Sequence, residues 1–366
     1  MDARQPSSRE DFDIGIICAL PLEYDAFSYI FDEFWDEDGD RYGRAAGDLN
    51  NYTTGRIGKY NVVLALLSRM GKATAAGAAA SFRVSYGNLR ITLLVGICGG
   101  VPPVNGSEEH EILLGDVVIS KTVVEYDLVK KYPDRFIRKD TFKDNLSKPN
   151  KDVSNLLVMF ETDRGLERLQ RKTASFLQRL QANAIQKGRR KYNYPGTVKD
   201  KLFESSYRHR HHESPTCICR DCKGDADPVC EGAIESTCDD LDCEEKYLVK
   251  DRKRLEIKQQ LEQEMSDQAQ EPAVHVGSFA SGNIVMKSAR DRDDIAKKEG
   301  VIAFEMEGAG IWEEVACIVV KGVCDYADCH KSKEWQHFAA ATAASASKAI
   351  LEQYIQTDKV LGGDRE

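Results

Sequence analysis

Short apolar runs alternate with helix-like stretches near both ends of this chain, and the alternation stops in its middle. Residues 13–20, 91–97 and 317–325 are apolar runs that predict buried strands. Residues 73–86 and 335–355, both rich in alanine, are helical in pattern. Because strands alternating with helices are typical of layered α/β proteins, we predict an α/β sheet with helices on both of its faces.

The middle of the chain has a different character. Charged helical periodicity runs from about residue 152 to 190, a tract rich in cysteine and histidine follows, and strand-like runs resume only at Val274. We therefore predict one α/β domain made of residues 10–140 and 273–357, interrupted by an insertion at 141–272. Apolar residues in the helical part predict packing on the core or on a neighbouring subunit. They are Leu156, Leu166, Leu169, Phe176, Leu177 and Leu180.

Composition excludes several classes of protein. With 42% hydrophobic and 30% charged residues, the chain is typical of globular proteins. A net charge of -9 argues against a nucleic-acid-coating role, because phosphate binding needs a basic surface. No apolar run approaches the roughly 20 residues that span a bilayer, and the N-terminus lacks the apolar stretch of a secretory signal. We expect a cytoplasmic protein with a small-molecule ligand and no membrane partner.

Glycines and carboxylates stand where predicted strands end, which is where ligands bind in open α/β sheets. Each one alone is as well explained by a tight turn or a helix cap. Their joint occurrence favours a binding or catalytic site in loops just past the strands. The residues are Glu23, Gly99, Gly100, Glu305, Glu307 and Asp325.

Five segments, in this order along the chain, resemble the purine and uridine phosphorylase family: IGIICALPLE, VGICGG, LLGDVVIS, FEMEGAG and VKGVCDYAD. Within the family the likeness is greatest to the methylthioadenosine and S-adenosylhomocysteine nucleosidases. The resemblance covers most of residues 13–130 and 274–355. It implies the nucleoside phosphorylase fold, a mixed twisted sheet flanked by helices, and cleavage of the bond between an adenine-type base and ribose without a catalytic cofactor. It also implies a homo-oligomer.

The resemblance implies roles for individual residues. Glu23 would activate water, Met306 and Glu307 would bind the ribose hydroxyls, and Asp325 would protonate the purine at N7. These residue types suit the chemistry, because the leaving base needs an acid beside it and the water needs a base. The implied substrate-binding residues are Gly99, Gly100, Asn283, Glu305, Met306, Glu307 and Lys321.

Departures from the family pattern leave three functions open. Lys321 stands where the nucleosidases carry an arginine near the water site, and lysine keeps the charge but lacks the planar fork of arginine. A hydrolase is favoured because Glu23 is retained. The alternatives are a phosphate-dependent phosphorylase and a catalytically silent nucleotide sensor.

A second resemblance concerns the segment after Asp325. Residues 330–336, HKSKEWQ, resemble nucleosidase-like domains of fungal NOD-like receptor architectures, and related domains in bacterial defence systems cleave ATP. This implies a substrate with a 5′-phosphate chain, ATP above all, held by Lys331 and Lys333, with Lys72 as a further contact. The ordinary alternative is that these lysines are solvated residues at the start of a helix.

The insertion carries the densest group of metal-ligand residue types. Three histidines, His209, His211 and His212, precede the cysteines, and the Cys219–Cys222 pair has the C-x2-C spacing of zinc sites. In a reducing compartment, crowded cysteines favour metal binding over disulfides. A structural zinc, disulfides and buried thiols all remain open, and no catalytic metal is expected. The cysteines are Cys217, Cys219, Cys222, Cys230, Cys238 and Cys243.

Overall fold

The fold is known from a computed structural model of the chain. It describes residues 5–102, 111–133, 136–139, 150–212, 216–222, 224 and 227–355. The predicted boundary between residues 140 and 141 lies outside these ranges. Within them, no helix combines the length and the apolar character needed to cross a bilayer.

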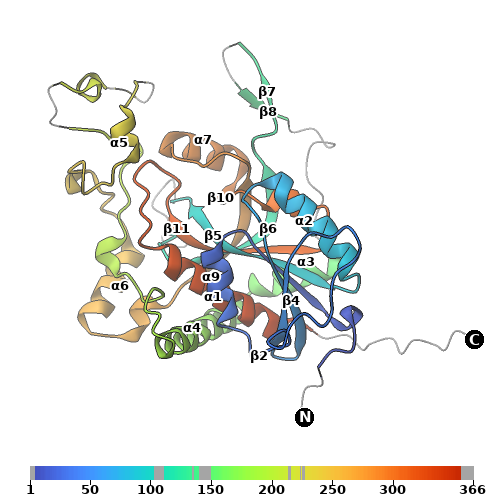
Figure 1. Ribbon diagram of the computed structural model, residues 1–366. Helices are drawn as coiled ribbons and strands as arrows, with labels where there is room; N and C mark the ends of the chain where they lie inside the picture. Colours follow the sequence, from blue (N-terminus) through green and yellow to red (C-terminus); the bar gives the residue numbers. More distant parts are fainter. Residues whose placement is uncertain are drawn as a thin grey trace, which may run out of the picture.

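A mixed sheet forms the centre of the molecule, as predicted (Figure 1). In the described ranges it has nine strands, in the order β10-β9-β6-β11-β5-β1-β4-β3-β2. Their bounds are β1 (Ile14–Cys18), β2 (Glu33–Phe34), β3 (Tyr52–Ile57), β4 (Tyr60–Leu66), β5 (Ile91–Gly100), β6 (Val117–Glu125), β9 (Val274–Ser281), β10 (Val301–Glu305) and β11 (Cys317–Asp325). A separate hairpin consists of β7 (Val129–Lys131) and β8 (Phe136–Arg138).

One end of the sheet closes on itself. β10 pairs in parallel with β9 and also antiparallel with β5, where Ala303 lies opposite Gly100 and Phe304 opposite Gly99. β5, β11, β6, β9 and β10 therefore form a closed ring of strands. This corrects the prediction that Gly99 and Gly100 lie in a loop, because both are paired residues of β5. A Cβ atom on Gly100 would lie 2.7 Å from a methyl of Val323 in β11, so glycine leaves room for that side chain at the end of β5.

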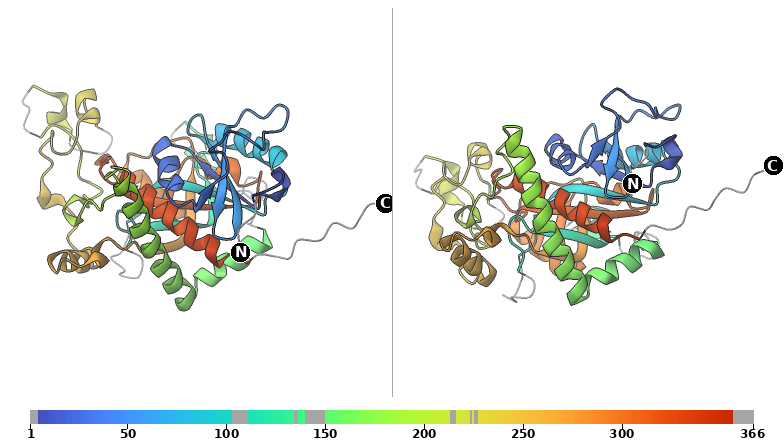
Figure 2. Two further views of the ribbon diagram at one scale, coloured as in Figure 1. Left: turned by 60° about the horizontal axis from the view of Figure 1, so that its bottom comes forward. Right: turned by 90° about the horizontal axis from the view of Figure 1, so that it is seen from below.

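Helices cover the sheet. They are α1 (Pro21–Ser28), α2 (Lys72–Ser85), α3 (Lys151–Phe160), α4 (Asp163–Gln186), α5 (Glu231–Glu235), α6 (Lys253–Gln263), α7 (Ala289–Glu299), α8 (Gly308–Ile311) and α9 (Gln336–Gln353). The alanine-rich α9 packs on β5, β6 and β11, and α1 and α4 pack on it in turn (Figure 2). Small residues allow this close contact, since a Cβ atom on Gly322 would lie 1.9 Å from the carbonyl oxygen of Ala339.

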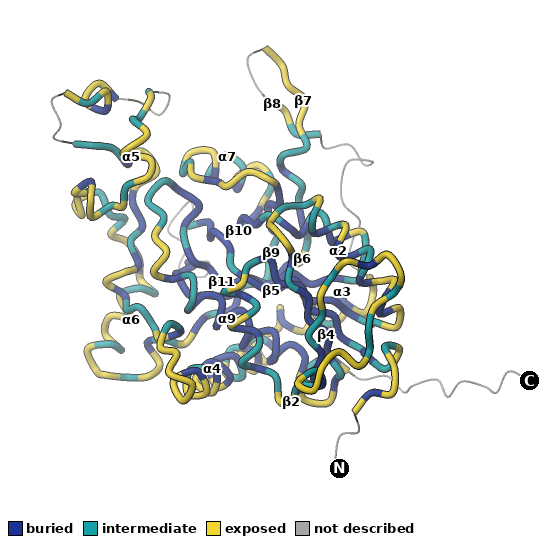
Figure 3. Tube along the Cα trace, in the orientation of Figure 1, coloured by how far each residue is buried: buried dark blue, intermediate teal, exposed yellow. Residues whose placement is uncertain are grey.

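The first part of the predicted insertion belongs to the main body. The apolar faces of α3 and α4 join the principal core, which confirms the predicted packing on the core. The buried residues of these two faces are Val153, Leu157, Phe160, Leu169, Phe176, Leu177, Leu180 and Ala184. The later part, around α5, protrudes from the body and is exposed over much of its length (Figure 3).

Candidate active site

Glu23 is fixed in a buried position at the start of α1. The helix begins directly after Leu20, so Glu23 lies in its first turn and not in the predicted loop. Its Oε2 accepts hydrogen bonds from the backbone N–H groups of Ala19 (2.8 Å) and Leu20 (2.9 Å), and its Oε1 accepts one from Ile97 (2.8 Å). A Cβ atom on Gly96 would lie 2.0 Å from this Oε1, so only glycine leaves room for the carboxylate.

A buried lysine joins two carboxylates. Lys321 lies in the middle of β11, and its Nζ is 3.4 Å from Oε2 of Glu307 and 3.9 Å from Oε1 of Glu23. Burial lowers the pKa of Lys321, but Glu23 and Glu307 raise it above the ordinary value, so the ammonium stays charged. Burial raises the pKa of Glu23 above 4.5, Lys321 opposes this rise, and Glu307 adds to it. The group is therefore a set of mutually dependent buried charges.

The two glutamates at and just after the end of β10 have different contacts. The carboxylate of Glu305 accepts hydrogen bonds from the backbone N–H groups of Glu307 (2.9 Å) and Gly308 (2.8 Å), so it holds the turn together. Burial and the neighbouring Glu307 raise the pKa of Glu305. Glu307 instead faces Lys321, and its Oε1 accepts a hydrogen bond from the backbone N–H of Gly71 at 3.3 Å. The half-buried Met306 lies between them in sequence.

Asp325 ends β11 beside the glycines of β5. Its Oδ1 accepts a hydrogen bond from the backbone N–H of Ala327 (2.8 Å) and lies 3.1 Å from Nζ of Lys331. The thiol of Cys324 is 3.4 Å from its Oδ2. A Cβ atom on Gly99 would lie 2.9 Å from Oδ1 of Asp325. Gly99 therefore leaves space for the carboxylate as Gly96 does for Glu23.

The lysines predicted to bind phosphate have different surroundings. Lys72 pairs with Glu125 at 2.5 Å and with Asp127, and these contacts hold its pKa above the ordinary value although burial lowers it. The backbone N–H of Lys72 donates to Oδ1 of Asn283 at 3.0 Å, which places Asn283 at the start of α2. Lys333 is exposed.

The insertion supplies residues that sequence patterns did not reveal. The hydroxyl of Tyr326 donates to Oδ1 of Asp200 (2.7 Å), and the guanidinium of Arg252 donates to the same oxygen (2.8 Å). Further along the loop, the indole N–H of Trp335 donates to the carbonyl of Lys199 (2.9 Å). Tyr326 and Asp200 are 126 residues apart, so no local spacing could have indicated their contact.

A cavity of about 790 Å³ lies on α1, β4 and α2. Tyr24 and Ala73, neighbours in sequence of Glu23 and Lys72, are part of its wall. Its lining contains no charged side chain. It consists of Tyr24, Gly47, Leu49, Asn50, Asn51, Tyr52, Thr53, Leu66, Leu67, Ser68, Ala73, Thr74, Gly77, Ala78 and Ser81.

The cysteine-rich tract forms two separate groups, and all eleven cysteines are free thiols. The first group is His209, Cys238, Cys243 and His330; the second is His211, Cys217, Cys219 and Cys230. Within each group the ligand atoms all lie within 4.8 Å of one another. The predicted Cys219–Cys222 pair is wrong, because Cys222 lies in neither group and its sulfur is 3.9 Å from backbone carbonyl oxygens. His212 lies outside both as well, beside the hydroxyl of Tyr207 at 3.0 Å.

The closed mixed sheet, with its carboxylates at strand ends, defines the fold of nucleoside phosphorylases and nucleosidases. A sequence profile of the phosphorylase superfamily matches residues 13–184 of the chain. The predicted resemblance and fold class are therefore confirmed.

Solved structures share the fold. The 5′-methylthioadenosine/S-adenosylhomocysteine nucleosidase of Helicobacter pylori is 13% identical with a TM-score of 0.51, and the match covers 94% of this chain and 99% of that one. The futalosine hydrolase of the same organism is 14% identical with a TM-score of 0.51, over 94% and 98% of the two chains.

A longer protein is similar in sequence to nearly the whole of this chain. A nucleotide-binding leucine-rich repeat (NLR)-like protein of Hyaloscypha variabilis is 31% identical over 355 residues, which is 95% of this chain. The chain spans 30% of the length of that protein. This agrees with the predicted likeness to domains of fungal NOD-like receptor architectures.

Proposed function

We propose that the protein hydrolyses the N-glycosidic bond of adenine nucleosides or nucleotides. The observation that carries this proposal is the placement of two carboxylates against glycines of one strand. Glu23 faces Gly96 and Asp325 faces Gly99. Gly96 and Gly99 both belong to β5, so the proposed base and the proposed acid lie against the same strand, as a reaction that divides its work between two carboxyl groups requires.

Each residue then has a defined part in the reaction. Glu23 takes a proton from water, and the hydroxide oxygen bonds to C1′ of the ribose while the bond from C1′ to N9 breaks. The bond's electrons leave with the base, and Asp325 gives its proton to N7. Glu307 accepts hydrogen bonds from the ribose hydroxyls, supported by the charge of Lys321.

The ion pairs of Lys321 favour water over phosphate as the attacking group. A phosphorylase holds phosphate with cations that are free to bind an anion. Here Glu23 and Glu307 already face the Lys321 ammonium, and a phosphate placed beside it would meet the negative charge of Glu23.

Two observations favour different 5′ substituents. Lys331, next to Asp325, would be released when Asp325 takes up its proton, and a phosphate chain would offer it a new partner; this supports ATP. The cavity beside Tyr24 carries no charged side chain, which supports an uncharged 5′ group such as that of adenosine or methylthioadenosine.

The test is to incubate the purified protein with adenosine, methylthioadenosine, AMP and ATP, with and without phosphate, and to measure free adenine by chromatography. We expect adenine without added phosphate, together with ribose or the matching ribose 5′-phosphate. Release that requires phosphate would identify a phosphorylase. Binding of all four compounds without release would identify a silent sensor.

A further inference from the structure

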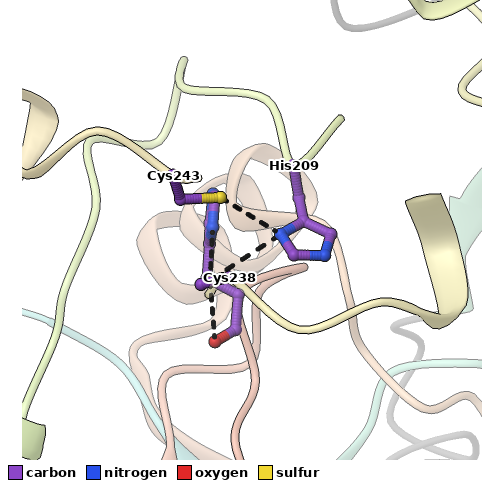
Figure 4. A group of neighbouring side chains, drawn as sticks. His209, Cys238 and Cys243 are labelled. Atoms are coloured by element: carbon purple, nitrogen blue, oxygen red, sulfur yellow. Dashed lines mark hydrogen bonds between the residues drawn. The ribbon is translucent and has the colours of Figure 1, made fainter. Parts of the chain in front are cut away.

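Two histidines and two cysteines from distant parts of the chain meet beside the loop that follows β11. His209, Cys238 and Cys243 come from the insertion, and His330 comes from the loop itself, five residues after Asp325. Figure 4 shows the ring of His209 directed at the sulfurs of Cys238 and Cys243. We propose that these four residues bind a structural zinc ion that fastens residues 209–243 to the loop that follows β11, residues 326–335. The proposal concerns metal binding and does not depend on the proposed enzyme activity.

The distances in the group are those of ligands around a common ion. Nδ1 of His209 lies 3.7 Å from the sulfur of Cys238 and 3.6 Å from that of Cys243, and Nδ1 of His330 lies 3.4 Å from the sulfur of Cys238. In a tetrahedral site with Zn–S of about 2.3 Å and Zn–N of about 2.0–2.1 Å, sulfur and nitrogen are about 3.6 Å apart. A ring nitrogen makes only one hydrogen bond, but Nδ1 of His209 lies equally close to two sulfurs. This arrangement is the one expected of three ligand atoms around a common ion.

The outer nitrogens of both rings have the partners that metal-binding histidines use. Nε2 of His209 lies 2.9 Å from the carbonyl oxygen of Ser236, and Nε2 of His330 lies 3.2 Å from that of Tyr207. A carbonyl oxygen only accepts, so each Nε2 must carry the proton that it donates. The neutral ring then presents the lone pair of Nδ1 to the cysteines, as in zinc sites with oriented histidine ligands.

The second group has the same geometry within the insertion. Nδ1 of His211 lies 3.7, 4.0 and 3.4 Å from the sulfurs of Cys217, Cys219 and Cys230. Around it, the separate core cluster of the described residues contains only three buried hydrophobic residues. So small a core needs a further source of stability, which a four-ligand zinc site supplies. We infer a second structural zinc ion here.

A zinc ion bound by the first group would hold the loop that follows β11 near its middle. The backbone N–H of His330 donates to Asp328 at 2.9 Å, and its ring stacks on Phe203 with centroids 4.2 Å apart. The next residue, Lys331, is the one that pairs with Asp325. A zinc ion on His330 would therefore fix the path of the chain between Asp325 and Lys331.

Metal content of the full chain tests the proposal. After purification without added chelator and dialysis, elemental analysis should find two zinc ions per chain. His330→Ala and Cys238→Ser should each bind one, and Cys219→Ser should bind one through loss of the other site. Cys222→Ser is the matched control, because this buried cysteine belongs to neither group, and it should bind two.

Two further measurements separate zinc binding from folding and from disulfides. His330→Cys supplies another zinc ligand and should restore the second ion. Hydrogen exchange of residues 326–335 should rise in His330→Ala and stay unchanged in Cys219→Ser. No zinc in the wild type, two ions in His330→Ala, or fewer than eleven titratable thiols after denaturation with chelator and without reductant would overturn the proposal.

Discussion

The ammonium of Lys331 lies 3.1 Å from the carboxylate of Asp325, the residue proposed to protonate the leaving base. An ion pair of this kind requires an ionised carboxylate, whereas a general acid must carry a proton. The two states are therefore exclusive, and the amine has to find a new partner or solvent when the acid form appears. Protonation of Asp325 is therefore coupled to the contacts that Lys331 makes with a substrate or with solvent.

The first prediction concerns Asp325→Asn, which should retain substrate binding but lose base release. The amide keeps its hydrogen bonds but cannot deliver a proton, and a general acid typically contributes about 10²- to 10⁴-fold in rate. Adenine release and calorimetric binding would be compared with Asp294→Asn, an exposed position on α7. Near-normal turnover would remove Asp325 from the mechanism.

The second prediction concerns substrate preference. If Lys331 meets a 5′-phosphate chain, Lys331→Ala should reduce kcat/KM for ATP by about ten- to more than a hundredfold relative to adenosine, the value of one charge-assisted contact. Lys333→Ala should also reduce kcat/KM for ATP relative to adenosine, but by a smaller factor, because Lys333 is exposed. Equal losses for both substrates, or a wild type that prefers adenosine, would contradict the phosphate contact.

The third prediction concerns pH. Glu23 works as a base only when ionised, so the rate falls as the pH drops through its pKa. Because burial raises this pKa, the acidic limb of the pH profile of kcat/KM should lie above pH 4.5. Lys321 lowers the pKa of Glu23, and Lys321→Met should therefore move the limb to higher pH.

A surface lysine on α7 provides the control for this shift. Lys298→Met removes one exposed charge and should leave the limb in place. An active Lys321→Met variant with the wild-type limb would show that Glu23 is not the titrating base.

The fourth prediction uses two glycines. In Gly96→Ala the new methyl would lie 2.0 Å from Oε1 of Glu23, so the carboxylate must move. We expect at least about a 100-fold loss of base release and a loss of about 1–3 kcal/mol in the free energy of unfolding. Gly77→Ala is the control for stability alone: a Cβ atom there meets nothing within 4 Å, and alanine in α2 should raise stability by about 0.5–1 kcal/mol. The free energy of unfolding of both variants would be measured by denaturant unfolding, and adenine release by Gly96→Ala would be measured by chromatography.

The fifth prediction concerns recognition of ribose. Glu307→Gln should weaken turnover of adenosine, because charge-assisted hydrogen bonds to the hydroxyls are lost. Turnover of 2′,3′-dideoxyadenosine should already be low in the wild type and should change little in the variant. A dideoxy substrate cleaved as fast as adenosine would rule out this role for Glu307.

The local sequence pattern was sufficient to predict much of the fold. The apolar runs at 13–20, 91–97 and 317–325 became β1, β5 and β11, and the helical pattern at 152–190 became α3 and α4 with their apolar faces on the core. These predictions succeeded because side-chain periodicity depends on near neighbours in the chain. The same reasoning placed Gly99 and Gly100 in a loop, because a glycine pair is as typical of turns as of strands that approach closely.

The sequence by itself therefore determined the α/β class, the order of the family segments and the residue types needed to cleave a glycosidic bond. Only the tertiary structure decided which of these residues meet. Pairing of β10 with β5 closes the sheet, and Glu307 thereby reaches Gly71, 236 residues away in the chain. Folding of the insertion brings Cys238 to His330, 92 residues away, and leaves Cys222 outside both groups. Such contacts depend on how whole elements pack, and no spacing along the chain records that packing.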